Sequence, residues 1–346
     1  MIKRNMLRIT TLPEELVEGL FGQVLLWIFE ILPYLEEREL VPEWEIRSKL
    51  YGDPKQEFIV IPGLLDPNFK REVGGKEPRT IKLLHLRDQG TVTLGNDWEY
   101  LSELWSKYFS IPDRIVERGE RFSNLGEALG LHYRGTDKNK AVEETNYVSE
   151  IDFLIVADDF IAKHPEITMI YLASDENEFF ERVRLRYPNH EVIESGPVVH
   201  HKDTGIGNGF EKGDHALLDC LLLSRCKYLL KCQSALSGFA KVLNPKLEAY
   251  RISANKLTPW AKEIPYFPDG FLPKYESESP ECRKVLDRLF VDDWTENSKV
   301  AGLYGPLFRY RKREGNTRRH ALMRRIWYGC ARRLELVRSR LRENQS

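Results

Sequence analysis

Cysteine is scarce in this sequence of 346 residues, and no two cysteines stand in a Cys-x-x-Cys pair. The five cysteines are Cys220, Cys226, Cys232, Cys282 and Cys330. An odd and sparse set does not build a disulfide framework, and a structural zinc site needs closely spaced ligands. We therefore expect buried thiols that pack as small apolar side chains in a reducing compartment.

The sequence also has no long apolar run. Its first apolar stretch, residues 24–32, is far shorter than the roughly 20 residues that cross a bilayer, and Glu30 interrupts it. No secretory signal is recognisable ahead of this stretch, so we expect a cytoplasmic protein.

The sequence also lacks a large net charge, because 52 Lys and Arg against 53 Asp and Glu leave −1 at neutral pH. Its overall charge does not mark the chain as a nucleic-acid binder. The balance hides an asymmetry, because residues 309–346 contain 13 basic and 3 acidic residues, a net charge of +10. The residues before them therefore carry about −11.

The basic segment 309–346 has the pattern of an amphipathic helix. Its apolar residues recur at helical spacing and are Leu322, Ile326, Trp327, Cys330, Leu334, Val337 and Leu341. The opposite face carries Arg324, Arg325, Arg332, Arg338 and Arg342. Such a helix either packs its apolar stripe on the acidic body of the protein or lies on an anionic membrane. We favour docking on the protein and keep peripheral membrane contact as the alternative.

What the sequence does contain is the composition of a folded protein with room for two domains. Hydrophobic residues make up 42% and charged residues 30%. Residues 1–122 predict a mixed α/β domain. Its expected elements are a mostly buried helix over 14–37, strands over 58–61 and 81–86, an exposed loop over 62–78 and an amphipathic helix over 98–108.

Residues 123–257 predict a regular alternation of strands and helices. The expected strands are 128–133, 168–173, 191–194, 228–231 and 249–252, and the expected helices are 147–163, 177–186, 214–224 and 236–243. Alternation of this kind implies βαβ crossovers and a parallel sheet, which is a Rossmann-like domain. Residues 258–308, in which prolines recur, are expected to form a connecting segment.

Polar residues collect directly after three of the expected strands. They are residues 132–138 after the first strand, Ser174 and Asp175 after the second, and residues 233–237 after the fourth. In open parallel sheets, ligands bind beyond the carboxyl ends of the strands, where the strand order switches. The sequence therefore predicts a ligand site at this edge of the sheet.

Arg134 is the residue in these loops best suited to phosphate. Its guanidinium is always charged and places two hydrogen bonds on phosphate oxygens. A departing nucleoside diphosphate gathers negative charge, which a fixed cation or a helix N-terminus offsets. The Asp-x-Asp pair that recruits a divalent metal to many sugar-nucleotide enzymes does not occur in the sequence. The alternative interpretation is a surface ion pair between Arg134 and Asp137.

Three segments carry a resemblance to a known family. Residues 132–138, His-Tyr-Arg-Gly-Thr-Asp-Lys, resemble the His-x-Arg-Arg-x-Asp-type peptide of the fucosyltransferase superfamily, which includes α1,6-, α1,2- and protein O-fucosyltransferases. Residues 171–175 resemble its strand-end Tyr-Leu-Ala-Ser/Thr-Asp peptide, and residues 216–237 its helix–strand–serine segment. The resemblance covers roughly residues 125–244, and residues 19–23 only approximate the family's Gly-x-Gly-x-Gln loop.

The resemblance implies a GT-B-like α/β fold, in which two Rossmann-like domains face a cleft and residues 1–122 lie on the acceptor side. It implies an inverting, metal-independent glycosyltransferase that transfers L-fucose from GDP-fucose to a glycan hydroxyl. The partners would be a nucleotide-sugar donor and a glycan or lipid-linked glycan acceptor, with no other cofactor. Two alternatives stay open, another nucleotide-sugar donor and a non-catalytic glycan-binding protein.

The family's functional positions map onto individual residues of this chain. By resemblance, Arg134 contacts the β-phosphate, Asp219 recognises the guanine and Asp175 organises the site. The remaining substrate-binding residues that the resemblance indicates are His132, Asp137, Lys138, Ser234, Ala235 and Gly22. No metal ligand is expected.

Two features depart from the family pattern or remain open. Gly135 stands where the α1,6 and α1,2 enzymes have a second arginine, which leaves the linkage undetermined. An inverting transfer also needs a base for the acceptor hydroxyl. Glu143 is the candidate, with one residue more spacing than in the α1,6 enzymes. The alternative is that Glu143 and Glu144 are solvent-facing acids at the start of a helix.

Overall fold

The computed structural model describes residues 5–16, 19–69, 77–88, 92–122, 124–135, 145–196, 209–256, 267–293 and 307–310. The basic segment 311–346 lies outside these ranges, so the amphipathic C-terminal helix stays a prediction. No helix within the described ranges is both long and apolar enough to cross a membrane.

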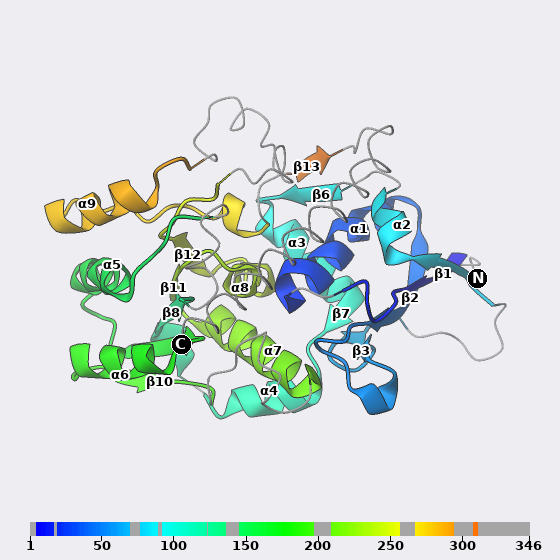
Figure 1. Cartoon of the computed structure of the whole chain (residues 1–346), viewed down its shortest axis with the longest axis horizontal. Helices are drawn as coiled ribbons and strands as arrows, with labels where there is room; N and C mark the ends of the chain where they lie inside the picture. Colours follow the sequence, from blue (N-terminus) through cyan, green and yellow to red (C-terminus); the bar gives the residue numbers. More distant parts are fainter. Residues whose placement is uncertain are drawn as a thin grey trace, which may run out of the picture.

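The first part of the chain folds around a four-stranded sheet with the order β3-β2-β1-β5 (Figure 1). Its strands are β1 (Asn5–Thr10), β2 (Leu40–Arg47), β3 (Ile59–Ile61) and β5 (Arg79–Lys82). Strand β1 is parallel to β2 and β5, whereas β3 is antiparallel to β2. In β2 the side chains of Trp44 and Ile46 are buried and alternate with polar residues, as expected for a strand with one face on the core.

A mostly buried helix connects β1 to β2. It starts as a π-helix, η1 (Leu20–Leu25), and continues as α1 (Leu26–Glu37). The prediction placed its start at residue 14, six residues too early. The predicted strand over 81–86 is correct only to Lys82, where α2 (Leu83–Asp88) begins. Leu83 and Leu86 are both buried, and their spacing of three is that of one helix face.

Other elements of the first part agree with the sequence or were missed. The predicted helix over 98–108 is α3 (Trp98–Tyr108), and the strand predicted over 58–61 is β3. Strands β1 and β2 were not predicted, nor was α4 (Asp113–Glu120). Two short pairs complete this part: β4 (Asp66–Pro67) with β7 (Phe109–Ser110), and β6 (Val92–Gly95) with β13 (Leu307–Tyr310).

The second part contains a five-stranded, fully parallel sheet with the order β10-β9-β8-β11-β12. Its strands are β8 (Leu129–Tyr133), β9 (Met169–Ser174), β10 (Glu191–Ile193), β11 (Tyr228–Lys231) and β12 (Glu248–Arg251). They alternate with α5 (Glu150–Lys163), α6 (Asn177–Arg186), α7 (Gly209–Arg225) and α8 (Ala235–Leu243). The predicted alternation of strands and helices is confirmed.

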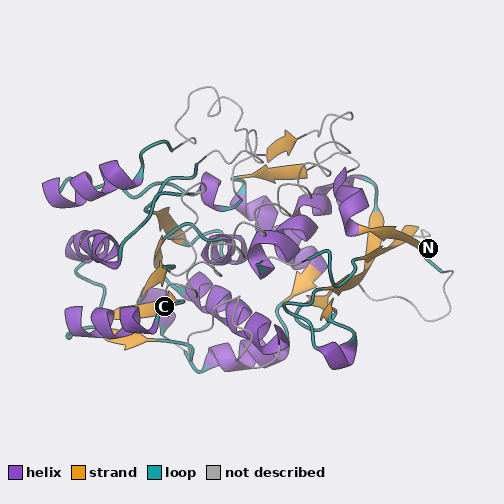
Figure 2. Ribbon diagram, in the orientation of Figure 1, coloured by secondary structure: helices purple, strands orange, loops and turns teal. Residues whose placement is uncertain are grey.

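Helices cover both faces of this sheet (Figure 2). One face packs against α5, α6 and the later helix α9 (Pro280–Leu289), and the other against α7 and α8. Burial on both faces explains why all five residues of β8 are buried and why its sequence does not alternate. The four described cysteines are buried free thiols, as predicted.

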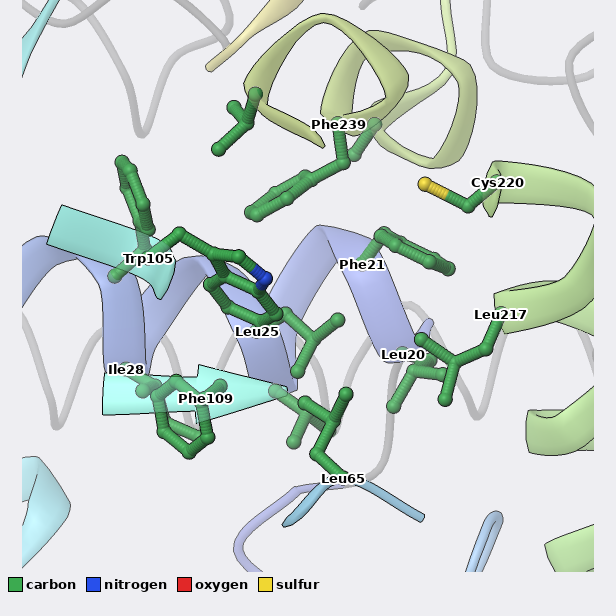
Figure 3. Close-up of a cluster of buried hydrophobic side chains, with 14 of the residues drawn as sticks. Leu20, Phe21, Leu25, Ile28, Leu65, Trp105, Phe109, Leu217, Cys220 and Phe239 are labelled. Carbon is green, nitrogen blue, oxygen red and sulfur yellow. The ribbon is translucent and has the colours of Figure 1, made fainter. Parts of the chain in front are cut away.

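The two parts of the chain share one hydrophobic core. Phe239 of α8 packs against Phe21 of η1, Phe29 of α1 and Trp105 of α3, with ring centroids 5.5 to 6.1 Å apart (Figure 3). The same cluster includes Leu217 and Cys220 of α7. Helix α8 is therefore positioned from both sides, by its own sheet and by helices of the first part.

The segment 258–308, predicted to be a connection, contains regular structure. Helix α9 packs with α5 and α6 on the parallel sheet in a separate hydrophobic cluster, the second core, and η4 (Asp269–Phe271) is a short 3₁₀ helix. Pro280 stands in the first turn of α9, where a missing N–H is harmless. Strand β13 then pairs with β6 of the first part, so Arg309 and Tyr310 belong to a strand rather than to the predicted C-terminal helix.

Candidate functional site

The site is built at the carboxyl ends of β8 and β11. These strands are neighbours in the sheet, with Lys231 opposite His132 and Arg251 opposite Lys231. From β8 the chain runs outward through β9 to β10 and then crosses back to β11 and β12. The order of the strands thus switches between β8 and β11, which is where a crevice opens in sheets of this type.

Arg134 follows β8 directly, and the residue before it, Tyr133, is held in place by packing and a hydrogen bond. Tyr133 is buried, lies 4.3 Å from the ring of Phe179 and donates a hydrogen bond to the carbonyl oxygen of Val148. The side chain of Arg134 is about a quarter exposed, with Nε 3.9 Å from Oδ2 of Asp175. Arg134 therefore leaves a rigid strand at the switch point.

Asp175, which follows β9, holds the backbone beside Arg134. Its Oδ1 accepts a hydrogen bond of 3.0 Å from the amide of Gly135, while Oδ2 faces Arg134. One carboxylate thus contacts both the backbone and the cation after β8.

Gly135 lies against a second carboxylate. A Cβ at this position would stand 2.2 Å from Oε1 of Glu176, the residue that precedes α6. Burial raises the pKa of Glu176, and the charges of Asp175 and Glu150 raise it further. Gly135 is therefore next to an acid.

The turn from β11 into α8 places a helix N-terminus at the same edge. Ser234 is the N-cap in extended backbone conformation, and Ala235 is the first helical residue. The Ser234 hydroxyl is buried and has no hydrogen-bond partner among the described residues. The first amides of a helix and its dipole favour an anion at this point.

A buried ion pair lies beneath this turn and was not predicted. Nζ of Lys231 is 2.6 Å from Oδ2 of Asp269 in η4, and both side chains are at most 1% exposed. The same oxygen accepts a hydrogen bond of 2.5 Å from the amide of Ser234. The lysine that ends an otherwise apolar strand, Tyr-Leu-Leu-Lys, was the available signal in the sequence. Nothing in the sequence indicated its partner, Asp269, which lies 38 residues further on.

His132 lies buried in β8 beside these cations. Burial, together with the charges of Lys231 and Arg134, holds the pKa of its imidazole well below the ordinary value. Its Nδ1 is buried with no partner within the described part of the chain. His132 is therefore a neutral group that lines the interior side of the site.

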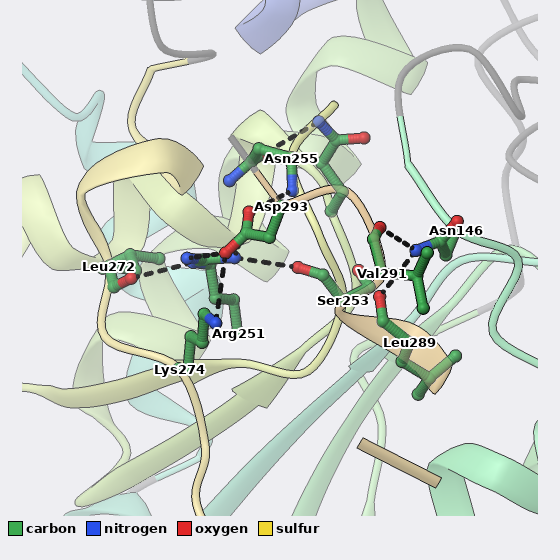
Figure 4. Close-up of polar contacts among 10 residues, drawn as sticks. Asn146, Arg251, Ser253, Asn255, Leu272, Lys274, Leu289, Val291 and Asp293 are labelled. Atoms are coloured by element: carbon green, nitrogen blue, oxygen red, sulfur yellow. Dashed lines mark hydrogen bonds and ion pairs between the residues drawn. The ribbon is translucent and has the colours of Figure 1, made fainter. Parts of the chain in front are cut away.

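A second buried network fastens the end of β12. Arg251 pairs with Asp293, and Asp293 also accepts a hydrogen bond from the amide of Asn255 (Figure 4). Asn255 accepts a hydrogen bond of 2.8 Å from Gln233, which directly precedes Ser234. Arg251, Asp293 and Asn255, which no sequence pattern singled out, thus support the turn from a third strand.

Asp219 lies in α7, which covers one face of the parallel sheet. Its Oδ1 accepts hydrogen bonds from the hydroxyl of Tyr171 at 2.7 Å and from Ser195 at 2.5 Å. Burial raises the pKa of its carboxyl, which these two hydrogen bonds oppose. These hydrogen bonds join α7 to β9 and to the segment after β10.

Gly22 lies in a helix rather than in the loop that the resemblance suggested. It belongs to η1, whose residue Phe21 packs on Phe239 of α8. Three predicted residues, Asp137, Lys138 and Glu143, lie outside the described ranges, and their roles stay predictions.

Within the described ranges, no group of three or more His, Cys, Asp or Glu side chains could hold a metal ion. A shallow pocket of about 270 Å³ lies between α6 and the residues after β10, and contains none of the predicted site residues. Its lining is formed by Asn177, Glu178, Phe180, Glu181, Arg184, Glu194 and Gly196.

No protein-family model matches the sequence, and no curated protein matches it. Among solved structures, the chain is similar to the NodZ α-1,6-fucosyltransferase soaked with GDP-fucose, at 16% identity and a TM-score of 0.46, over 72% of this chain and 95% of that one. It is similar to apo POFUT1 at 10% identity and a TM-score of 0.45, over 72% and 99%. It is also similar to a mutant of FUT1 from Arabidopsis thaliana in complex with GDP, at 11% identity and 0.43, over 72% and 71%.

Proposed function

We propose that this protein is an inverting glycosyltransferase that transfers L-fucose from GDP-fucose to a glycan hydroxyl without the help of a metal ion. The observation that supports this best is the convergence of Arg134 and the N-terminus of α8 at the switch between β8 and β11. A cation and a helix N-terminus side by side suit a diphosphate.

In this proposal the donor's diphosphate lies across the ends of β8 and β11. The Arg134 guanidinium binds the β-phosphate, while the hydroxyl of Ser234 and the first amides of α8 donate to phosphate oxygens. As the bond from the anomeric carbon to the phosphate oxygen breaks, the negative charge that develops on GDP is stabilised by groups already in place. Asp175 keeps Arg134 and Gly135 in position.

The remaining roles follow from the same arrangement. Asp219 accepts hydrogen bonds from the base of the nucleotide. Glu143 takes the proton of the acceptor hydroxyl as the hydroxyl oxygen attacks the anomeric carbon.

The proposed architecture is GT-B-like. Residues 123–257 form the Rossmann-like donor domain, and residues 1–122 present the acceptor. The parallel strands of both sheets support this division. The basic segment 309–346 docks on the protein, or meets a membrane when the acceptor is lipid-linked.

A nucleotide panel tests the donor. Thermal unfolding is followed with GDP, UDP, ADP and dTDP at equal concentration, because a ligand at a hundred times its Kd stabilises the folded state by about 2.7 kcal/mol. We expect GDP to raise the Tm most. A larger Tm shift with another nucleotide would mean that the donor carries that nucleotide instead of GDP. Stabilisation by free glycans alone would favour a glycan-binding protein.

Arg134→Ala tests the phosphate contact, with Arg186→Ala as the matched control. Arg186 is a half-exposed arginine whose guanidinium pairs with Asp158, far along the chain from the proposed site. We expect Arg134→Ala to abolish transfer and the GDP-dependent Tm shift without lowering the Tm of the free protein by more than a few degrees. Near-normal turnover in Arg134→Ala would overturn the proposal, and Arg186→Ala should keep both properties.

A further inference from the structure

The turn from β11 into α8 contacts a residue from a distant part of the sequence, Asp269, which lies 35 residues beyond Ser234. Asp269 begins η4 and is fully buried. Its Oδ2 accepts two hydrogen bonds, from the amide of Ser234 at 2.5 Å and from Nζ of Lys231 at 2.6 Å. A single carboxylate oxygen thus joins the last residue of β11 to the N-cap of α8.

Close packing fixes Asp269 from its other side. A Cβ on Gly238, in the first turns of α8, would stand 2.6 Å from Oδ1 of Asp269 and 2.3 Å from Cγ of Pro268. Side chains cannot approach to these distances, so only glycine lets α8 lie this close. Glycine at this position therefore lets Pro268 and Asp269 pack directly against α8.

The ion pair alone does not explain this arrangement. Burial lowers the pKa of Lys231, and the charge and hydrogen bond of Asp269 oppose that shift. Well-packed apolar residues in place of a buried ion pair are often as stable or more so. What an apolar pair does not supply is an acceptor for the Ser234 amide, which would otherwise be a buried donor without a partner.

We propose that Asp269 is a positioning residue for the phosphate-binding turn, and that its hydrogen bond to the Ser234 amide sets the direction of the Ser234 hydroxyl and of the first amides of α8. The proposal rests on the proposed function, since it assigns this turn to the diphosphate. Ser234 fits such a role because its hydroxyl is buried at the amino end of α8 with no partner among the described residues.

Two double variants, whose side chains at position 269 have the same number of non-hydrogen atoms, separate geometry from charge. Lys231→Met/Asp269→Asn removes both charges but keeps an amide oxygen that accepts from Ser234. Lys231→Met/Asp269→Leu removes the charges and the acceptor together. Because neither variant leaves a lone buried charge, both are expected to fold. The Kd for GDP is measured by calorimetry on each, beside the wild type.

We expect Lys231→Met/Asp269→Asn to bind GDP within about threefold of the wild type and Lys231→Met/Asp269→Leu to bind at least tenfold more weakly, which is about 1.4 kcal/mol. Ser48→Ala is the control for lost stability. It removes a buried hydrogen bond of 2.7 Å to the carbonyl oxygen of Leu16, in the first part of the chain. We expect this variant to lower the Tm and to leave the Kd for GDP unchanged.

The outcomes distinguish a failure of the positioning role of Asp269 from a failure of the proposed function. If the wild type binds no GDP, the proposed donor is wrong, whatever the variants do. If the wild type binds GDP and the Leu variant binds equally well, the positioning role of Asp269 is wrong while the function stands. Equal weakening in the Asn and Leu variants would also overturn it, since charge and not the Ser234 contact would then matter.

Discussion

Arg251 and Asp293 lie 42 residues apart and form a two-pronged buried ion pair, with Nη2 2.9 Å from Oδ2 and Nη1 3.2 Å from Oδ1. Neither side chain is more than 4% exposed. The pair attaches the segment after α9 to β12, the last strand of the parallel sheet.

We predict that Asp293→Asn strongly destabilises the protein. The substitution leaves the Arg251 guanidinium buried without a full counter-charge, and breaking a buried pair in this way costs about 3–5 kcal/mol. Urea denaturation measures the loss. Asp158→Asn, which breaks the half-exposed pair with Arg186, should cost no more than about 1 kcal/mol. Equal losses in the two variants would contradict the importance of burial.

Gly238→Ala should destabilise the protein although alanine favours helices. Propensity alone would stabilise α8 by about 1 kcal/mol. The added methyl group would meet the ring of Pro268 and Asp269 at distances that atoms do not adopt, and such overpacking costs about 1–3 kcal/mol. Gly126→Ala is the control, because nothing lies within 4 Å of a Cβ there. A Tm for Gly238→Ala at or above the wild-type value would show that the space is larger than the structure indicates.

His132 should make the protein less stable in mild acid. The unfolded chain takes up a proton on this side chain near pH 6.5, whereas the buried imidazole, with its pKa held well below that value, does not. The unfolded state therefore binds more protons below pH 6.5, and the free energy of unfolding falls by up to about 1.4 kcal/mol per pH unit as the pH drops. Above pH 6.5 this contribution to stability is fully present. In His132→Gln we expect a shallower fall between pH 6.5 and 5, and an unchanged slope would contradict a depressed pKa.

The second part of the chain was readable from sequence because its signals are local. Buried strands such as β8 are short apolar runs, each followed by a helix of regular period, and that alternation fixes parallel pairing. The placement of Arg134, Asp175 and Ser234 followed from it, since each stands at the end of a strand. In the first part, β2 was missed because Pro42, Glu43 and Glu45 weaken its strand propensity. In the structure, its buried residues Trp44 and Ile46 alternate with polar ones.

The supporting residues of the site could not be predicted, because their partners are distant in the sequence. Asp269 and Asp293 sit in a proline-containing segment without periodicity, and each acquires its role only when the chain returns to β11 or β12. Lys231 and Arg251 would be expected at the surface from their residue type. Only the folded chain shows that they are paired in the interior.

Phe239 tests whether the two parts of the chain unfold together. Its ring contacts Phe21, Phe29 and Trp105 of the first part, yet α8 belongs to the parallel sheet. We predict that Phe239→Ala costs about 3–5 kcal/mol, through lost burial and the cavity left behind. Calorimetry should still show one transition, because a shared core makes the parts cooperative. Phe153→Ala is the comparison, since Phe153 is buried in the second core alone and its loss should also shift a single transition. If either variant instead unfolds in two separated steps, the halves have independent cores, and the position of α8 at the site would depend on its own sheet only.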